Sequence, residues 1–497
     1  MTDPTPPGFC RRHYFVLAAL VLGLSAFNLT YRLDREFVTE WDESLYAMSA
    51  WEMAGSHDWI GVRMFGNLDY SNTKPPLNVW LLVIAFETFG RNLFALRFFS
   101  VLSAWSTILA LMVWSGRRFG EPVALTGGLI LSTTFGFLHV HSGRTANTDA
   151  LFTLLLSLVV ITLSASGRRP WRRIYLGPLL AAAFLLRGMA VLMPLAIVLA
   201  MEVTDRRRWR ERLAPIGVAS LLFLSPIVAW AAARYRLDGL LFLQPLFTYD
   251  FVARSLEPLD GHAGGPLYYV NILVKHQYDW LLAVIAAAVI TPGIAALARS
   301  VPARWRADRE WLTLIAAWIG ATVLIPTLMA TKTPWYLNTF YPLFALGAAQ
   351  LLVHAFRELS RAEARTRLIA LSAIVVVACG IAEAKLWAYS LRYRDLSVSA
   401  QGLLFAEADR LAGRRVYRDR LDRSTTFVAG LVSVELVTAP GAEELVGPVE
   451  RVERGDFVLV SSPPHHLRRR WIVVASNTGN WLLVRRPRDL PSLRRPD

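Results

Sequence analysis

The stretch Leu213–Ala233 reads LAPIGVASLLFLSPIVAWAAA and contains no ionisable side chain. A run of roughly 18 or more apolar residues is long enough to cross the hydrocarbon core of a bilayer as a helix. The chain has 497 residues, 54% of them hydrophobic, and a mean hydropathy of +0.37. These values are rare in soluble proteins of this length, so the sequence predicts an all-α polytopic membrane protein. Further runs of this kind are Tyr14–Thr30, Trp311–Met329 and Leu368–Trp387.

The positive charge of the chain is spread over short loops. A net charge of +15 would suggest nucleic-acid binding in a soluble protein, but here it is divided among the loops between apolar runs. That pattern is typical of membrane orientation, so we expect no nucleic-acid partner. The two cysteines, Cys10 and Cys379, lie beside or inside predicted spans, and they offer neither a disulfide framework nor a metal cluster.

Arginines orient the predicted spans, because basic residues concentrate on the cytoplasmic side of a membrane. Arg11 and Arg12 place the N-terminus in the cytoplasm, and no small-residue cleavage site follows the first run, which predicts a retained anchor. Alternating the later basic loops gives about eleven spans. We therefore predict a transmembrane domain over residues 1–390, with external loops at 31–96 and 236–279.

Two apolar segments are not predicted to cross the membrane as single spans. Residues 174–203 lie between two basic loops and must cross an even number of times, which predicts a short helical hairpin with Arg187-Gly188 at its outer turn. Counting Pro75–Gly90 as a span would invert every later loop. We therefore predict that Pro75–Gly90 is an interfacial or re-entrant helix on the outer side.

The chain changes character after residue 391. This tail is polar and contains runs typical of strands, such as Phe457–Ser461 and Trp471–Ala475. We predict that residues 391–497 form a small soluble α/β domain outside the membrane. Its many arginines break the orientation pattern, but long domains largely escape that rule.

Ionisable residues group on the predicted outer face, at span ends or in the loops between spans. Such groups are costly near the membrane and usually face a cavity or one another. Outer loops must hold polar residues in any case, yet the number of these residues favours a shared outer cavity. They are Asp42, Lys74, Arg144, Asp149, Arg187, Arg254, His262 and Lys332.

Two of these residues are lysines in a chain that strongly prefers arginine. Among 53 Lys plus Arg residues only four are lysine, and both Lys74 and Lys332 stand beside a proline at a predicted external turn. A compact ammonium on a rigid turn suits contact with a phosphate oxygen. The alternative is a lysine at a span end whose ammonium extends to the membrane surface.

Two carboxylates invite a catalytic interpretation. Asp42, next to Glu43, follows Trp41 soon after the first span and could take a proton from an acceptor hydroxyl. An aspartate at this position is also a good helix N-cap, which is the simpler interpretation. Asp149 admits the same two interpretations, with an ion pair to Arg144 as a further option.

Five groups of residues, in order along roughly residues 10–350, resemble known proteins. Together they resemble the aminoarabinose transferases and the protein O-mannosyltransferases of the GT-C superfamily. The groups are Trp41-Asp42-Glu43 with Tyr46-Ala47 and Lys74-Pro75-Pro76-Leu77; Gly143–Asp149; Leu185–Gly188; Gly265–Tyr269 ahead of Trp280; and Lys332–Tyr336 leading to Tyr341-Pro342.

The resemblance implies an inverting transfer of a sugar from a polyprenyl-phosphate donor such as an undecaprenyl-phosphate sugar. Asp42 matches the aspartate that activates the acceptor hydroxyl, and Glu43 and Asp149 complete the catalytic candidates. Lys74, Arg254, Lys332 and Tyr336 match positions that hold the carrier phosphate. Arg144, Arg187, His262 and Tyr268 are candidates for the cavity wall.

One departure from the family concerns a metal. Relatives of the aminoarabinose type often have an acidic residue before the Lys-Pro-Pro turn, where this chain has Thr73. A lone external histidine such as His262 is more often structural than a ligand, so we expect no metal ion and name no other cofactor. Arg187 stands where many relatives have lysine, which keeps the charge but changes the geometry.

Three functions stay open at this point. The first is a glycosyltransferase in the bacterial inner membrane, with its site on the extracytoplasmic face and lipid A, another envelope glycan or a protein as acceptor. The second is a flippase for polyprenyl-linked glycans, which should show charged mid-membrane features or similar halves. The third is a non-catalytic subunit in which Asp42 is only a cap.

Overall fold

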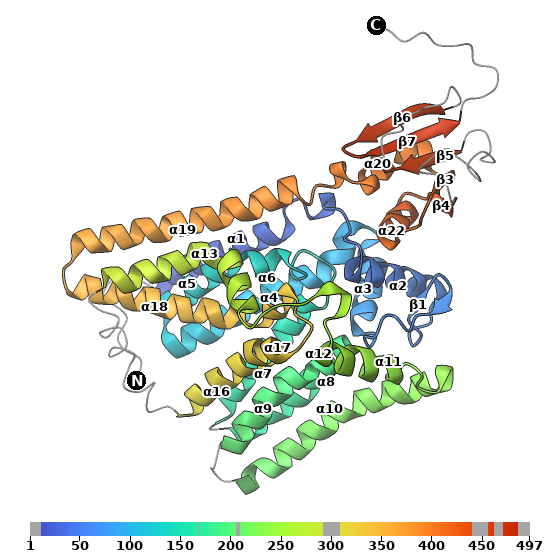
Figure 1. The fold of residues 1–497 in the computed structure, drawn as a ribbon. Coiled ribbons are helices and arrows are strands. Elements are labelled where there is room, and N and C mark those ends of the chain that lie inside the picture. The colour runs from blue at the N-terminus through green and yellow to red at the C-terminus, as the bar shows by residue number, and fades with distance from the viewer. Residues whose placement is uncertain are drawn as a thin grey trace. The chain divides into compact units, whose positions relative to one another are not determined.

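The computed structural model describes residues 11–167, 169–204, 209–291, 309–439, 456–461 and 471–485. Most of these residues are helical (Figure 1). A two-stranded sheet of β1 (Arg63–Met64) and β2 (Asn67–Leu68) lies early in the chain, and five strands lie in its C-terminal part. The chain forms two compact units. Unit 1 comprises Met1–Tyr31, His57–Leu81 and Arg97–Trp387, and unit 2 comprises Arg32–Ser56, Leu82–Leu96 and Ala388–Asp497.

Apolar helices dominate the transmembrane region. The described part of the chain holds eight stretches long and apolar enough to span a membrane, which makes this an integral membrane protein. The count of eleven spans stays a prediction. The elements that carry these stretches are α1 (Arg11–Thr30), α4 (Leu93–Phe119), α7 (Asp149–Ser166), α8 (Leu176–Arg187) with α9 (Leu192–Thr204), α10 (Trp209–Asp238), α13 (Tyr268–Ile290), α16 (Arg309–Ile319) with α17 (Ile325–Leu328), and α19 (Arg365–Arg392).

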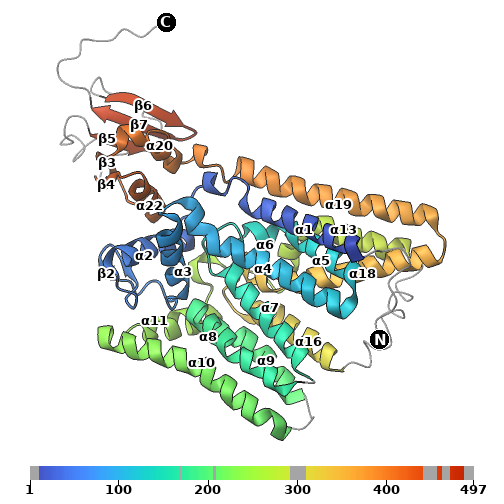
Figure 2. The same cartoon turned by 180° about the vertical axis from the view of Figure 1, so that it is seen from behind.

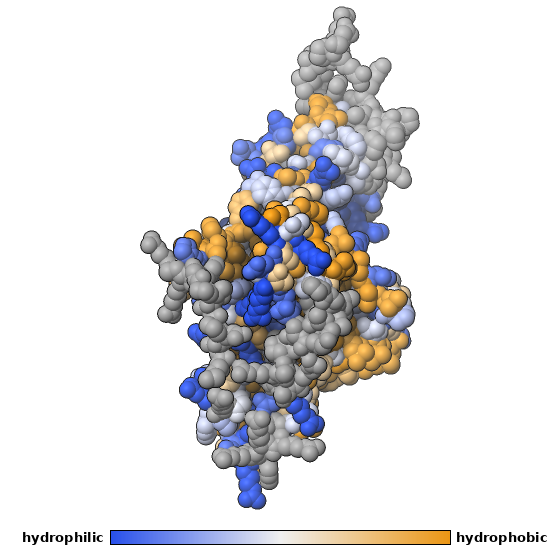
Figure 3. Space-filling model, turned by 90° about the vertical axis from the view of Figure 1, so that its left-hand side faces the viewer, coloured by the Kyte–Doolittle hydropathy of each residue, from blue (hydrophilic) through white to orange (hydrophobic). Residues whose placement is uncertain are grey.

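The helices of unit 1 bury a large apolar core and also expose apolar side chains. The rings of Phe27 on α1 and Trp387 on α19 are 5.5 Å apart, and the two helices lie side by side in both ribbon views (Figure 2). Exposed apolar side chains include Val289, Leu328 and Val376. Figure 3 shows one face on which hydrophobic areas flank groups of hydrophilic residues. Exposed apolar surface of this extent suits contact with lipid.

The helical hairpin predicted over residues 174–203 is confirmed. The turn η3 (Gly188–Val191) separates α8 from α9, and Gly188 has φ 56°, where a Cβ atom would approach Leu246 Cδ1 to 2.6 Å. At the other end of both arms, Arg173 Nε lies 2.6 Å from Glu202 Oε1. The two ends therefore meet, and the turn falls at the expected residues.

Polar side chains separate two helices within residues 121–140. Residues 121–140 form two helices, α5 (Glu121–Ser132) and α6 (Phe135–His139). The break lies at Thr133 and Thr134, whose hydroxyls donate to carbonyl oxygens of α5. Such bonds offer the backbone an alternative to a regular helix.

The segment Pro75–Gly90 does contain a helix, α3 (Leu77–Phe89). The depth of this helix in the membrane stays a prediction.

The expected external loop over residues 236–279 is largely helical. It contains α11 (Leu243–Phe247), a π-helical turn η4 (Thr248–Ala253), α12 (Arg254–Leu256) and η5 (Leu259–Gly261), and its residues 268–279 belong to α13. In the structure Asp279 pairs with Lys385, and His276 Nδ1 lies 3.1 Å from the hydroxyl oxygen of Tyr341. Partners of this kind allow polar side chains within an apolar helix.

The predicted C-terminal α/β domain exists and lies in unit 2. Its sheet has the strand order β4-β3-β5-β7-β6, with β3 parallel to both β4 and β5, and β7 antiparallel to both β5 and β6. Arg468–Arg470 lie outside the described residues. The elements are α20 (Ala400–Ala406), α21 (Ala408–Leu411), β3 (Arg415–Arg418), α22 (Arg423–Leu431), β4 (Glu435–Thr438), β5 (Phe457–Val460), β6 (Trp471–Asn477) and β7 (Asn480–Arg485).

Unit 2 also contains the helix α2 (Asp42–Ser56) from the first predicted external loop. The ring of Trp51 on α2 meets the ring of Phe427 on α22 edge to face, with centroids 5.9 Å apart. Phe86 stacks on the same Phe427 ring at 6.1 Å. Segments distant in sequence therefore share one aromatic core.

Candidate active site

The turn before α3 fixes the position of Lys74. Asp69 Oδ1 accepts hydrogen bonds from the backbone N–H of Ser71 at 2.8 Å and of Asn72 at 3.3 Å, and Asn72 Oδ1 accepts one from the Lys74 N–H at 3.3 Å. Asp and Asn side chains commonly stabilise turns in this way. Pro75 and Pro76 then lead directly into α3, where a helix start tolerates proline.

The Lys74 ammonium forms an ion pair with Asp250, a residue that the sequence did not identify. Arg254 Nε lies 3.3 Å from the same carboxylate, so one anion joins two cations. Asp250 belongs to the π-helical turn η4, and such turns are frequent at functional sites. The Asp-x-x-x-Arg spacing within 250–254 was the available sequence signal.

A second ion pair lies beside the first. Arg187, at the end of α8, pairs with Asp149, the first residue of α7. The ring of Tyr336 links the two pairs, because its hydroxyl lies 3.3 Å from Arg254 Nη1 and its centroid lies 5.9 Å from Arg187 Cζ. We call Lys74, Arg187 and Arg254 with Asp149, Asp250 and Tyr336 the cation cluster.

The charges of the cation cluster favour an anion. Three cations against two carboxylates leave one positive charge in a largely buried site. Burial, together with the nearby guanidinium groups of Arg254 and Arg187, lowers the pKa of Lys74, although Asp250 opposes this shift. Burial also disfavours the charge on Arg254, but Tyr336 and Asp250 outweigh it and raise the pKa of Arg254. Groups of this kind bind phosphate oxygens.

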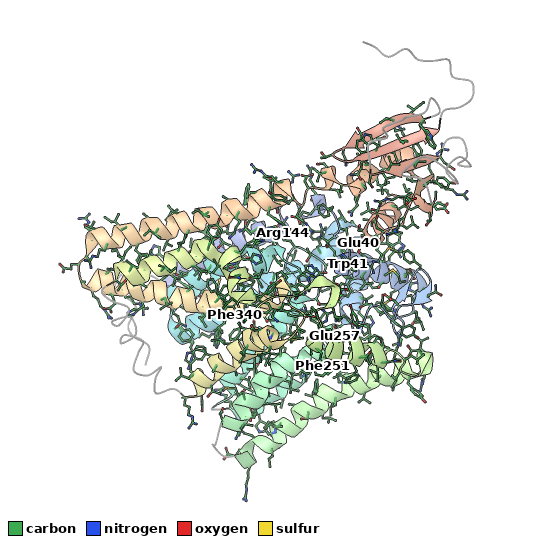
Figure 4. All side chains as sticks on the ribbon, viewed as in Figure 1. Glu40, Trp41, Arg144, Phe251, Glu257 and Phe340 are labelled. Atoms are coloured by element: carbon green, nitrogen blue, oxygen red, sulfur yellow. The ribbon has the colours of Figure 1, made fainter. Side chains whose placement is uncertain are left out.

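Lys332 lies on one segment, and Arg254 and His262 lie on another whose backbone is hydrogen-bonded to it. The backbone N–H of Thr331 donates to Arg254 O at 3.2 Å, and that of Lys332 donates to His262 O at 2.9 Å. The Lys332 ammonium donates to Met329 O at 2.6 Å. The His262 ring packs edge-on against Trp335, with centroids 5.5 Å apart. The structure thus brings the backbones of these candidates together. Figure 4 labels Phe251 and Glu257 in this segment.

Arg144 and Tyr268 support neighbouring elements. Arg144 is almost fully buried, and its guanidinium donates to Asn28 O at 2.5 Å and to Tyr31 O at 2.7 Å, at the end of α1 (Figure 4). These hydrogen bonds satisfy carbonyl oxygens that, at a helix end, have no donor within the helix. Tyr268 is the first residue of α13, and its ring meets that of Tyr269 at 5.1 Å.

Asp42 and Glu43 begin α2 in unit 2. Asp42 is half-buried, whereas Glu43 is fully buried. Glu43 Oε2 accepts hydrogen bonds from the backbone N–H and the hydroxyl of Thr39, both at 2.8 Å, as a helix cap does. Asp42 is therefore the more accessible carboxylate of the two. The catalytic roles of both residues and of Asp149 stay predictions.

Thr73, the residue before Lys74, is in contact with the lysine side chain. The Lys74 ammonium donates to Thr73 Oγ1 at 3.3 Å, so this hydroxyl faces a cation. Among the residues that the structure describes, no group of three or more His, Cys, Asp and Glu side chains is placed to hold a metal ion.

Part of the chain is similar in sequence to transferases named for lipid-phosphate sugar donors. Residues 73–230 match the family described as dolichyl-phosphate-mannose-protein mannosyltransferase. The chain is 28% identical over 356 residues to undecaprenyl phosphate-alpha-4-amino-4-deoxy-L-arabinose arabinosyl transferase 2 of Pseudomonas fluorescens (strain Pf0-1), covering 69% of this chain and 61% of that protein. It is 28% identical over 268 residues to the arabinosyl transferase of Pseudomonas aeruginosa (strain UCBPP-PA14), covering 52% and 48%. The chain spans about three fifths of the length of the first of these relatives.

Solved structures share the fold. ArnT from Cupriavidus metallidurans bound to undecaprenyl phosphate superposes with a TM-score of 0.65 at 17% identity, over 95% of this chain and 98% of that one. The archaeal oligosaccharyltransferase AglB from Archaeoglobus fulgidus, in complex with an inhibitory peptide and a dolichol-phosphate, gives a TM-score of 0.57 at 12% identity, over 91% and 70%. At these identities, both similarities are evidence for the fold alone.

Proposed function

We propose that this chain, an aminoarabinose-transferase-like protein of the GT-C superfamily, transfers a sugar from a polyprenyl-phosphate donor to an acceptor outside the cytoplasm. The cation cluster carries the proposal, because Lys74 and Arg254 share the single carboxylate of Asp250 and the Tyr336 hydroxyl accepts from Arg254 at 3.3 Å. These three residues were predicted to hold the carrier phosphate. In the proposal, the phosphate oxygens take the place that the Asp250 carboxylate occupies.

The reaction follows from the charge that develops on the leaving group. The acceptor hydroxyl oxygen attacks the anomeric carbon while the bond from that carbon to the phosphate oxygen breaks. The carrier phosphate leaves with the electron pair, and Lys74 and Arg254 stabilise its added negative charge. Asp42 takes the hydroxyl proton as general base. A single displacement of this kind inverts the anomeric configuration.

The arginine distribution supports an extracytoplasmic site. Basic pairs such as Arg117-Arg118 favour the cytoplasmic side, and the predicted topology places the cation cluster at the opposite ends of the spans. We infer a location in the bacterial inner membrane. The curated relatives are bacterial proteins named for undecaprenyl phosphate and 4-amino-4-deoxy-L-arabinose, so this donor is the first to test. Lipid A is the first acceptor to test, followed by other envelope glycans and proteins.

The proposed chemistry needs no metal ion, because the cations of Lys74 and Arg254 would themselves stabilise the charge of the leaving phosphate. A chelator should therefore leave the transfer rate unchanged within about twofold, as expected for purely electrostatic stabilisation. A loss of transfer that added divalent cation restores would overturn this part of the proposal.

The decisive experiment compares purified wild type with Asp42→Asn in nanodiscs. Each protein is incubated with polyprenyl-phosphate sugars and a membrane lipid extract, and transfer is followed by mass spectrometry. We expect Asp42→Asn to lose at least about 10²-fold in rate, because general bases contribute that much, and to keep carrier binding. The exposed Asp34, changed to Asn, is the matched control in the same unit. Carrier binding without transfer by wild type would instead favour a flippase.

A further inference from the structure

The segment that precedes Asp42 is held by residues from the far end of the chain. The backbone N–H of Val38 donates to Gln401 Oε1 at 2.8 Å, and Gln401 Nε2 donates back to Val38 O at 2.9 Å. Gln401 lies on α20 and is 5% exposed. We call residues 36–42 the Asp42 loop. One buried side chain therefore satisfies both backbone groups of a loop residue.

Arg394 fixes the start of the Asp42 loop and the helix that follows it. The Phe37 N–H donates to Arg394 O at 3.1 Å, and Arg394 Nη2 donates to Phe37 O at 3.2 Å. The same guanidinium lies 3.5 Å from Glu36 Oε2 and 3.6 Å from Glu43 Oε2. Both carboxylates are buried, and this guanidinium is a charge partner that they share within unit 2. Removing one partner of such a buried group leaves charge uncompensated.

A third contact holds the loop one residue before Trp41. Glu40 Oε2 accepts from the Ser424 N–H at 2.9 Å, and Glu40 Oε1 accepts from Arg423 N and Nε, both at 3.3 Å. These donors form the first turn of α22, where a carboxylate is favourable. Figure 4 shows Glu40 and Trp41 close to this helix.

These anchors surround a strained residue. Trp41 has φ 73°, a left-handed backbone conformation that is unfavourable for a bulky side chain. Trp41 is 69% exposed, so burial of the residue does not hold it in this conformation. Strained backbone of this kind persists where the surrounding structure over-determines it. Here the anchors at Val38, Glu40 and Glu43 lie on both sides of Trp41. They hold the backbone that leads into Asp42.

We propose that the C-terminal segment of the chain sets the catalytic geometry of Asp42, with Gln401, Arg394 and Arg423 as positioning residues. The proposal rests on the proposed function, since it assigns these residues to the base of that reaction. It predicts that weakening an anchor slows transfer while the carrier still binds, because the carrier phosphate is assigned to residues of unit 1. The C-terminal α/β domain thereby becomes part of the reaction machinery.

Gln401→Leu tests the proposal in the full-length protein. Leucine has a similar size but neither donates to nor accepts from Val38. We measure amide hydrogen exchange over residues 38–44, the binding of undecaprenyl phosphate, and kcat and KM for transfer. We expect faster exchange in this segment, a kcat lower by about tenfold or more because small misplacements are costly, and unchanged carrier binding. The β-strand amides report whether the domain stays folded.

Three further variants separate the outcomes. Arg415→Gln breaks an exposed ion pair with Glu435 in the same domain and should leave exchange and kcat unchanged. Glu40→Gln keeps an acceptor for Ser424 and should give a smaller kcat loss than Glu40→Ala, which shows rescue by the conservative change. Exchange that is unchanged in Gln401→Leu overturns the proposal, as does faster exchange with a wild-type kcat. Absence of transfer by wild type overturns the proposed function instead, and the exchange measurement still decides the role of Gln401.

Discussion

The cation cluster and the Asp42 loop both gather buried charges, but they use them in opposite ways. In the cation cluster, side chains pair with side chains, and the Asp250 carboxylate is shared by Lys74 and Arg254. In the Asp42 loop, the Glu43 and Arg394 side chains also bond to the backbone of the loop. Side-chain pairs can exchange one anion for another with little change in the fold. Bonds to the backbone instead fix the path of the chain.

This difference predicts different results from similar substitutions. Changes in the cation cluster should alter the affinity for an anion while the fold persists. Changes among the residues that hold the Asp42 loop should alter local stability and catalytic rate. The predictions below test that distinction, and they begin with the largest expected effect.

Arg394→Met should destabilise unit 2 strongly. The substitution leaves Glu36 and Glu43 buried without their guanidinium, and loss of one partner of a buried pair costs about 3–5 kcal/mol. Hydrogen exchange of α2 and α22 amides in the full chain measures the effect. Arg392→Met is the matched control, because Arg392 is exposed two residues away. Equal exchange in both variants would mean that the loop does not depend on the buried pair.

Arg254→Gln should weaken carrier binding. A hydrogen bond to a charged group contributes about 1.5–3 kcal/mol, so the Kd for undecaprenyl phosphate should rise by about 10- to 100-fold. The thermal midpoint should stay close to that of wild type. Isothermal titration in nanodiscs gives the affinity, with exposed Arg236→Gln as a control for net charge. An unchanged Kd would remove Arg254 from the phosphate site.

Part of this comparison could be predicted from the sequence. The positions of Lys74, Arg254 and Tyr336 at loop ends, together with their motifs, indicated one site, and the structure joins them. Asp250 was missed because its role depends on a π-helical turn, and no local sequence pattern predicts such a turn. The anchors of the Asp42 loop were missed for a related reason. Val38 and Gln401 are far apart in the chain, and a single side chain bonding to a backbone leaves no periodic signal.

The same reasoning applies to the fold. Long apolar runs predicted the spans, and runs typical of strands within the tail predicted β5 and β6. The first part of α13 falls in the segment that was expected to be an external loop. It contains Asp279, and burial of this carboxylate becomes acceptable through its ion pair with Lys385 on α19. Local patterns therefore predict an element well when its environment is uniform, and poorly when a distant partner changes that environment.

Asp422→Ala should have a moderate, pH-dependent effect on unit 2. Burial disfavours the charge on Asp422, but Arg418 and the hydrogen bonds from Thr425 and Ser424 outweigh it and hold the pKa of Asp422 below its ordinary value. Asp422 caps α22, so its loss should cost about 1 kcal/mol. The stabilisation is present above the unfolded-state pKa of about 3.9 and is lost as pH falls through the lower folded-state pKa.

Exchange of α22 amides between about pH 7 and pH 3 measures this dependence. The difference between wild type and Asp422→Ala should shrink as the pH approaches the lower end. Asp409→Ala, at an exposed position in the same domain, should show no such difference. A difference that stays constant over this range would show that the charge of Asp422 does not stabilise the helix that holds Glu40.

Asp250→Asn should have the smallest effect and the opposite sign. The change removes the carboxylate that competes with a phosphate for Lys74 and Arg254, so carrier affinity should rise by a few-fold, up to about tenfold. Asp260→Asn is the control, because it alters a carboxylate of the same segment that bonds to Tyr249. Tighter binding in Asp250→Asn alone identifies the cation cluster as a site with an exchangeable anion. Weaker binding would mean that Asp250 organises the two cations for the carrier, so that both regions are built to hold a fixed geometry.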